Sequence, residues 1–363
     1  FVVSFEAVLR QLGLHTSTRT LGIVLPVGIS FYTFQAMSYT IDVYRREIPP
    51  TRNLTNFLAY VAFFPQLVAG PIERARHLLP QFDRTLTITR PMLEEGFWLM
   101  VWGMFKKVFI ADNLDSLVNM VYGSGSYSAP IVLLATVAFA VQIYCDFSGY
   151  SDIARGTARI LGFDLMLNFN LPYAATSIRE FWRRWHISLS TWLRDYLYVS
   201  LGGNRAGRAR AYINLGITMV LGGLWHGAAW NFVLWGIWHG VGLMANRAFD
   251  GRIRQSLFSW VGTICFVLYG WLLFRARSME EIVAMTRSFA NFSAPAWINS
   301  YVVNLVLFTL PLVAIELWLL QSRDLLAPLR LRRSLKAMLE GLLLLGIILY
   351  WERNPAPFIY FQF

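Results

Sequence analysis

The sequence predicts an all-α fold, that of a polytopic helical membrane protein. Of its 363 residues, 56% are hydrophobic and 15% are charged, and the mean hydropathy is +0.46. An average soluble domain carries about 25% charged residues and fewer apolar ones. The apolar residues also gather into long runs, and a helix of about 20 mostly apolar residues crosses the hydrocarbon core of a bilayer. Composition and run length together favour a chain that lies largely within the membrane.

The expected helices follow the apolar runs in order. Several runs are long enough to span the bilayer, whereas others would cross only part of it, so partly inserted or re-entrant helices are expected among them. Pro65 to Pro71 places prolines and a glycine against an apolar run, which indicates a broken helix lining a protein interior. The runs are residues 21–44, 54–68, 92–110, 129–142, 212–224, 231–245, 257–274, 301–320 and 337–350.

The net charge of +11 does not indicate a nucleic-acid-binding protein. The basic residues cluster in short breaks between apolar runs, at residues 205–210, 247–254 and 323–336. Short loops rich in arginine and lysine are typical of the cytoplasmic side of a membrane protein. The lipid bilayer is therefore an expected partner, and nucleic acid is not.

A single membrane domain covering residues 1–363 is expected, because no linker or change of composition divides the chain. The sequence begins at Phe1 rather than at a methionine, and it shows no signal peptide. We therefore expect the full protein to carry further sequence upstream of this domain.

One histidine lies where lipid-embedded sequence is expected. His226 follows Trp225 in the stretch GGLWHGAAW, and basic residues flank both ends of the apolar segment 212–245. If both ends are cytoplasmic, about 34 residues of helix, which rise about 50 Å, are too short for two full crossings. We expect a re-entrant hairpin or two unequal, tilted legs with His226 near the apex, where Gly222 and Gly223 allow a turn or close backbone approach. An ionisable group at this depth favours a functional site.

His186, in FWRRWHISLSTW, is the second candidate. An imidazole titrates near neutrality and can accept and return a proton, as transfer of an acyl group to a hydroxyl requires. The alternative for both histidines is structural, with the ring forming hydrogen bonds between helices. His239 repeats the Trp-His-Gly pattern, but its spacing along one helix places it on nearly the opposite face from His226, so a structural role is favoured for it.

Charged residues near the histidines have two interpretations each. Asp146 and Asp152 either orient a histidine and line a polar tunnel, or cap the next helix and pair with Arg155. Arg183 and Arg184, interleaved with tryptophans, fit an interfacial amphipathic helix or a site for the phosphates of a nucleotide-bearing acyl donor. No clustered His and Cys spacing predicts a metal site, and no serine-nucleophile motif occurs.

Taken together, these segments resemble the membrane-bound O-acyltransferase family. The resemblance is carried by FWRRWHISLSTWLRDYLYVSLGGNR and GGLWHGAAWNFVLWGIWHG, together with LPVGISFYTFQAMSYTIDVYR, FFPQLVAGPIER, QIYCDFSGYSDIARG and FIYFQF. These motifs are most similar to the bacterial branch that includes the membrane proteins of alginate O-acetylation and of teichoic-acid D-alanylation. The resemblance covers nearly the whole chain and departs from the family at the front, where the family usually has further transmembrane helices.

The resemblance implies a multi-helix fold around a central tunnel in a bacterial inner membrane. It implies that His226, in the Leu-Trp-His-Gly motif, is catalytic and that His186, in Trp-His-x-Ser, is the second polar member of the site. Asp146, Asp152 and Trp225 are then expected to line the tunnel or orient its groups. The expected donor is acetyl-CoA or another acyl thioester, with no permanently bound cofactor and no metal. The expected acceptor is an exopolysaccharide such as alginate or a cell-wall polymer, reached directly or through an extracytoplasmic SGNH-type acetyltransferase.

Two other classes of function stay open at this point. One is a transporter of polysaccharide or lipid-linked sugar whose inward histidines relay protons, although no internal repeat is evident. It predicts proton-coupled flux that does not depend on an acyl thioester. The other is a non-catalytic scaffold that recruits an extracytoplasmic acetyltransferase, and it predicts that histidine substitutions are silent. Whether the acyl group is acetyl or D-alanyl also stays open, with acetyl favoured by the resemblance.

Overall fold

The computed structural model describes residues 28–67, 70–205, 207–249, 255–352 and 358, and these residues form helices, turns and loops with no β-strand among them. The all-α prediction is confirmed. The longer helices are α2 (Ile29–Tyr44), α3 (Leu54–Val61), α6 (Arg90–Met104), α7 (Asp112–Val121), α8 (Ala129–Ile160), α11 (Gly207–His226), α12 (Trp230–Ala248), α13 (Leu257–Arg275), α14 (Met279–Arg287), α15 (Ile298–Ser322) and α16 (Arg333–Leu349). The shorter helical segments are α4 (Phe64–Leu67), α5 (Ala75–Leu78), η1 (Leu79–Gln81), η2 (Phe105–Ala111), η3 (Pro172–Ala174), α9 (Ile178–Arg184), α10 (Ile187–Trp192), η4 (Leu193–Tyr198), η5 (Ser288–Ala290) and η6 (Ala327–Arg330).

The apolar runs coincide with helices wherever the structure describes them. The run at 54–68 is split into α3 and α4, and the run that starts at 129 continues far beyond its expected end, to Ile160 in α8. Residues 21–27 of the first run lie outside the described residues. Of the described helices, α8, α13 and α15 are long and apolar enough to cross a membrane. Most of α8 is buried among other helices, whereas most of α15 is exposed, as expected of a helix that contacts lipid.

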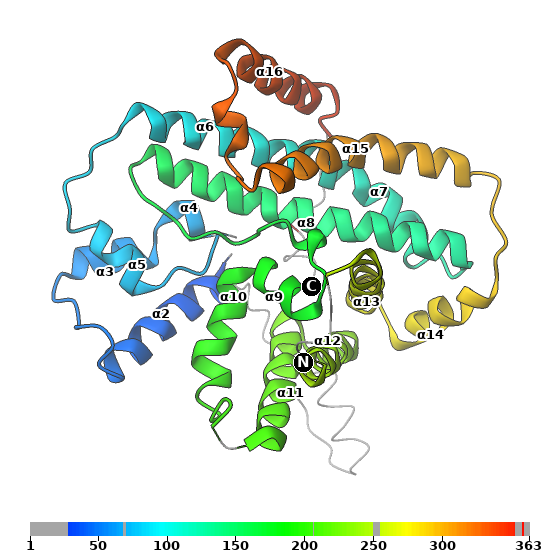
Figure 1. Cartoon of the computed structure of the whole chain (residues 1–363), viewed down its shortest axis with the longest axis horizontal. Helices are drawn as coiled ribbons and strands as arrows, with labels where there is room; N and C mark the ends of the chain where they lie inside the picture. Colours follow the sequence, from blue (N-terminus) through cyan, green and yellow to red (C-terminus); the bar gives the residue numbers. More distant parts are fainter. Residues whose placement is uncertain (1–27, 68–69, 206, 250–254, 353–357, 359–363) are drawn as a thin grey trace, which may run out of the picture.

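The centre of the molecule is the antiparallel pair α6 and α8, which run side by side across Figure 1. Glycines let their backbones touch. A Cβ atom on Gly103 would lie 2.6 Å from the carbonyl oxygen of Gly149, and one on Gly156 would lie 2.6 Å from the carbonyl oxygen of Gly96. Small residues at such contacts are the usual way in which membrane helices pack closely. This close packing therefore positions α8 and the loop that follows it.

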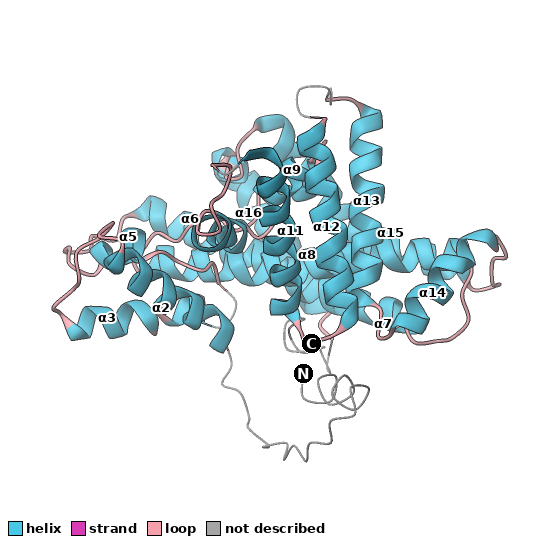
Figure 2. Ribbon diagram, turned by 90° about the horizontal axis from the view of Figure 1, so that it is seen from below, coloured by secondary structure: helices cyan, strands magenta, loops and turns pink. Residues whose placement is uncertain are grey.

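α11 and α12 form an antiparallel hairpin joined by residues 227–229, and Figure 2 shows the hairpin beside α13. His226 is the last residue of α11, so its expected position at the apex is confirmed. The two legs, α11 and α12, extend into the basic flanks and contain 20 and 19 residues. Each leg is about 30 Å long, which is enough to cross the hydrocarbon core, so the helix lengths give no reason to expect a re-entrant hairpin. Gly223 lies within α11 rather than in the turn, and it packs against the carbonyl of Phe232 on the other leg.

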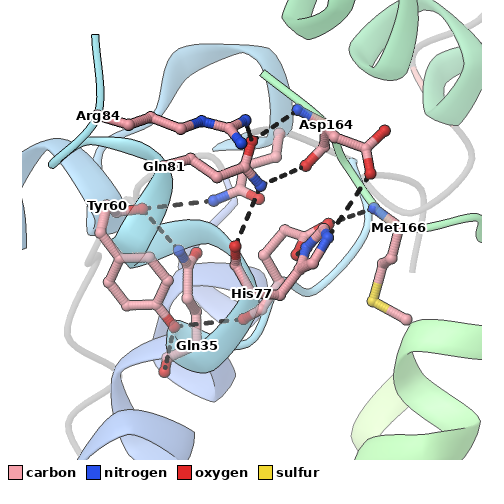
Figure 3. A network of polar contacts seen from close by, with 9 residues as sticks. Gln35, Tyr60, His77, Gln81, Arg84, Asp164 and Met166 are labelled. Carbon is pink, nitrogen blue, oxygen red and sulfur yellow. Dashed lines mark hydrogen bonds and ion pairs between the residues drawn. The ribbon is translucent and has the colours of Figure 1, made fainter. Parts of the chain in front are cut away.

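The broken helix expected at residues 65–71 is confirmed, because α4 ends at Leu67 and residues 70–74 are buried without helical structure. A polar network holds the segment that follows (Figure 3). The His77 ring lies between two carboxylates, with Nδ1 2.7 Å from Glu73 and Nε2 3.7 Å from Asp164. Glu73 also accepts a hydrogen bond from the backbone N–H of Met166. The network ties this segment to residues 162–171, the strap that follows α8.

Candidate active site

His226 is surrounded by aromatic rings at the turn between α11 and α12. Its ring centroid lies 4.8 Å from that of Trp225, 5.2 Å from that of Trp235 and 5.0 Å from that of Phe274. Trp235 belongs to α12 and Phe274 to α13, so three helices together fix the position of this imidazole.

His186 is buried in the sharp bend between α9 and α10, with 1% of its surface exposed. Its backbone is left-handed, with φ at 41°, a conformation that costs a non-glycine residue on the order of 1–3 kcal/mol. Main-chain hydrogen bonds hold the bend: the Ile187 N–H donates to the carbonyl of Asn168, and the Ser190 N–H donates to the carbonyl of His186, both at 2.9 Å. Phe147 of α8 packs edge-on against the imidazole at 4.5 Å between centroids. Strain of this kind, sustained by its surroundings, is a feature of functional positions.

The Trp225 ring packs near both histidine rings. Its ring centroid lies 6.2 Å from that of His186 and 4.8 Å from that of His226. Phe31 of α2 closes the group, at 6.0 Å from Trp225 and 6.4 Å from His186. The structure thus brings together three residues that the sequence analysis selected, from two segments far apart in the chain. A continuous tunnel through this group stays a prediction.

Asp146 and Asp152 lie within α8. Neither caps a helix, so the interpretation of these residues as helix caps was wrong. Asp152 forms an ion pair with Lys106 at 2.6 Å and lies 3.5 Å from Arg155, which confirms the expected pairing with that arginine. Asp146 forms an ion pair with Lys107 at 2.7 Å. Asp152 therefore neutralises a buried lysine and Asp146 a half-buried one, which favours the structural interpretation over orientation of a histidine.

His239 packs between α12 and α13, with no exposed surface. Its ring centroid lies 4.8 Å from that of Trp235, and a Cβ atom on Gly270 would lie 2.7 Å from its Nε2. The helix breaks between His226 and His239, so the two residues do not lie on opposite faces of one helix, as was expected. The close fit of α12 against α13 at this ring nevertheless agrees with a structural role.

Arg183 and Arg184 have different surroundings. Arg184 donates two hydrogen bonds to Glu180 Oε1, at 2.8 and 3.0 Å, and a third to the carbonyl of Asn170 at 3.1 Å. It is therefore held by its own helix and by the strap. Arg183 is exposed and instead lines a cavity of about 380 Å³.

We call this the arginine cavity, because arginines reach it from several segments: Arg179 and Arg183 from α9, Arg194 from η4 and Arg247 from α12. No carboxylate is among the described residues that line it. Arg194 also forms an ion pair with Asp195, at 2.7 Å. The concentration of four arginines suits a phosphate-bearing ligand, because guanidinium groups bind phosphate bidentately. Of this set, only Arg183 was predicted from the sequence, since Arg194 and Arg247 come close to it only through the fold.

The arginine cavity lies near the histidines. Trp182 lines the cavity, and its ring centroid is 5.7 Å from that of Trp235. Trp235 in turn lies 5.2 Å from His226. Two aromatic contacts therefore separate the cavity from the histidine at the hairpin turn.

Asn168, in the strap, is a site residue that the sequence analysis missed. It is fully buried, and its side-chain oxygen lies 3.2 Å from His186 Nδ1. An asparagine in a loop is so common that the sequence offers no signal for this role; only its proximity to the bend reveals it.

Comparisons with known proteins point to one family. The family model described as MBOAT, membrane-bound O-acyltransferase family, matches residues 45–286. The chain is 46% identical over 300 residues to the protein named "Probable alginate O-acetylase AlgI" of Pseudomonas aeruginosa, an alignment that covers 82% of this chain and 57% of that protein. The protein of the same name from Azotobacter vinelandii is 45% identical over 300 residues, covering 82% of this chain and 59% of that protein.

A third relative is the "Peptidoglycan O-acetyltransferase" of Helicobacter pylori, 34% identical over 307 residues, covering 76% of this chain and 58% of that protein. The chain therefore spans between 57% and 59% of the length of these three relatives. The family match covers the α9–α10 bend, the α11–α12 hairpin and the arginine cavity. The chain belongs to the membrane-bound O-acyltransferase family.

Proposed function

We propose that this protein is a multi-pass O-acetyltransferase of the bacterial inner membrane. It moves an acetyl group from a cytoplasmic thioester, acetyl-CoA or another acyl thioester, towards the hydroxyl groups of an exopolysaccharide similar to alginate or of a cell-wall polymer. One observation carries the proposal: His186 and His226, from the two motifs of the resemblance, meet at Trp225 inside a helical membrane fold. The names of the three relatives support acetyl as the acyl group.

His226 acts as the general base in this proposal. It takes the proton of the acceptor hydroxyl while the hydroxyl oxygen attacks the carbonyl carbon of the thioester. The new C–O bond forms, the C–S bond breaks, and the proton passes from the imidazolium to the departing thiolate, so the products are an ester and a thiol. His186 assists in one of two ways, by orienting the acceptor or donor or by stabilising the negative charge that develops on the carbonyl oxygen.

The arginine cavity is the proposed site for the phosphates of the donor. The four arginines that line it supply positive charge, and Trp182 leads from it towards Trp235 and His226. A donor bound there would have its anionic part in the cavity and its thioester near the histidines. Arg183 belongs to this site, whereas the hydrogen bonds of Arg184 to Glu180 give it a supporting role.

The acceptor side is proposed from the chemistry of the family. The bilayer surrounds the protein, and the acetyl group reaches the polymer directly or through an extracytoplasmic SGNH-type acetyltransferase. Alginate and peptidoglycan appear in the names of relatives, and both are polymers outside the cytoplasmic membrane. These names, and not a contact in this chain, support the choice of acceptor.

The test uses the full-length protein with its partner proteins in a host that lacks its own copy. Ester-linked acetate on surface polysaccharide is measured for the wild type and for His226→Ala and His186→Ala, at matched abundance in the membrane. We expect acetate with the wild type and none above background with His226→Ala. Wild-type acetate in both variants would favour the scaffold, and proton-coupled flux without thioester consumption would favour the transporter.

A further inference from the structure

Asn168 connects three elements around the strained histidine. Its side-chain Nδ2 donates to Ser151 Oγ of α8 at 3.1 Å, and its backbone carbonyl accepts from Ile187 N–H at 2.9 Å. Its side-chain Oδ1 lies 3.2 Å from the backbone nitrogen of Ser188, 2.9 Å from Ser188 Oγ and 3.2 Å from His186 Nδ1. Asn168 and Ser188 are both fully buried, so water does not compete for these bonds.

The backbone determines which way the Asn168 amide is turned. The N–H of Ser188 is always a donor, so the atom that faces it at 3.2 Å must be the carbonyl oxygen. If the amide were rotated by 180°, its NH₂ group would face that N–H, and two donors would oppose each other in a buried site. The oxygen therefore faces His186 Nδ1 as well.

The orientation of the amide determines the tautomer of His186. An oxygen 3.2 Å from Nδ1 is an acceptor, so Nδ1 must carry the hydrogen. Among the described residues, the other polar atom near Nδ1 is Ser188 Oγ at 3.5 Å, and its hydrogen is donated to Asn168 Oδ1 at the shorter distance of 2.9 Å. Both neighbours thus present lone pairs to Nδ1. A neutral imidazole has one N–H group, so Nε2 is the nitrogen with the lone pair.

We infer that Asn168 is a positioning residue that holds His186 as the Nδ1–H tautomer, so that Nε2 accepts a proton or a hydrogen bond from the substrate. The inference rests on the proposed function and decides between the two roles that it leaves to His186. A neutral His186 in this tautomer cannot donate a hydrogen bond from Nε2 to the developing oxyanion. It binds an O–H or N–H group of the acceptor or donor instead.

The direct test determines the tautomer of His186 in the absence of substrate. The full-length protein, labelled with ¹⁵N at its histidine side chains, is placed in lipid nanodiscs; the 363-residue sequence contains five histidines. Protonated and unprotonated ring nitrogens resonate at well-separated ¹⁵N frequencies, and Nδ1 and Nε2 differ in their couplings to the ring protons. Loss of one signal set in His186→Asn assigns the residue. We expect Nδ1 to be protonated in the wild type, and a protonated Nε2 in neutral His186 would overturn the inference.

Activity of Asn168 variants tests the consequence for the reaction. Asn168→Ala removes the oxygen and should lower kcat on the order of 10²-fold, since positioned proton acceptors contribute at least this much. Asn168→Asp keeps an acceptor oxygen and should retain activity within about tenfold of the wild type. Asn170→Ala is the matched control, because this strap asparagine bonds Arg184 through its backbone. Equal loss in Asn168→Asp and Asn168→Ala would overturn the positioning role.

Two measurements, the ¹⁵N spectrum of the wild type and the transfer activity of the histidine variants, separate this inference from the proposed function. If His186→Ala and His226→Ala both retain transfer, the proposed function fails, whatever the ¹⁵N spectrum shows. If transfer depends on both histidines but the wild type carries its proton on Nε2, the tautomer inference alone fails. The wild-type spectrum needs no variant at Asn168, so a variant that does not fold leaves the test intact.

Discussion

Adjacent arginines on α9 offer a sharp test of the donor site, because the fold gives them different tasks. Arg183→Gln removes a charge that lines the arginine cavity, whereas Arg184→Gln removes the hydrogen bonds to Glu180 and to the strap. A hydrogen bond to a charged group contributes about 1.5–3 kcal/mol, and Arg183 is exposed, so we take the lower value. A loss of about 1.5 kcal/mol raises Kd about tenfold.

The assay is equilibrium dialysis of radiolabelled acetyl-CoA against the purified full-length protein in nanodiscs, with the thermal midpoint of unfolding measured on the same samples. We expect Arg183→Gln to raise Kd about tenfold with little change in the thermal midpoint. Arg184→Gln should lower the free energy of unfolding by about 1–3 kcal/mol and change Kd less than about twofold. Tenfold weaker binding in Arg184→Gln, with normal binding in Arg183→Gln, would refute the assignment of the cavity.

Further predictions concern the stability of the fold. Gly103→Leu places a side chain against the carbonyl of Gly149 and should lower the thermal midpoint strongly, whereas Gly341→Ala, where a Cβ atom meets open space, should keep or raise it; equal effects would contradict the α6–α8 contact. Lys107→Met leaves the carboxylates of Asp112 and Asp146 without their shared cation and should cost about 3–5 kcal/mol in chemical unfolding; a cost under about 1 kcal/mol would show that the ion pairs are dispensable. The carboxylates of Asp164 and Glu73 raise the pKa of His77 to about 10. Because the folded pKa exceeds the unfolded value of about 6.5, the stability lost in His77→Gln should be largest below pH of about 6.5 and vanish as the pH rises to about 10; a difference that grows with pH would contradict this network.

Much of the fold could be predicted from the sequence, because apolar runs are local features. Helices formed at these runs, and the break at residues 65–71 followed from its prolines and glycine. The lengths of the two hairpin helices were underestimated, because these helices continue through the basic flanks to Gly207 and Ala248. A hydropathy pattern records where apolar residues stop, whereas a helix ends where its backbone hydrogen bonds stop.

The candidate site was predictable only in part. His186 and His226 were selected because histidines in apolar surroundings are rare, and the fold brings both to Trp225. The ion pair of Asp146 with Lys107 could not be foreseen, because Lys107 lies in η2 and not in α8. Asn168 was missed for a similar reason: its contact with His186 depends on the path of the strap. Long-range partners of polar residues follow from tertiary structure, which local sequence patterns do not contain.

The central claim is that His186 and His226 serve one reaction at one site. The decisive measurement is the initial rate of labelled acetyl transfer by the full-length protein and its partners, compared for His186→Ala, His226→Ala and the double variant at equal membrane abundance. Each single variant should lose on the order of 10²-fold or more in rate. Because groups that act as a unit are not additive, the double variant should be only about as slow as the slower single variant. Losses that multiply in the double variant, or a single variant that transfers acetyl at the wild-type rate, would contradict the account.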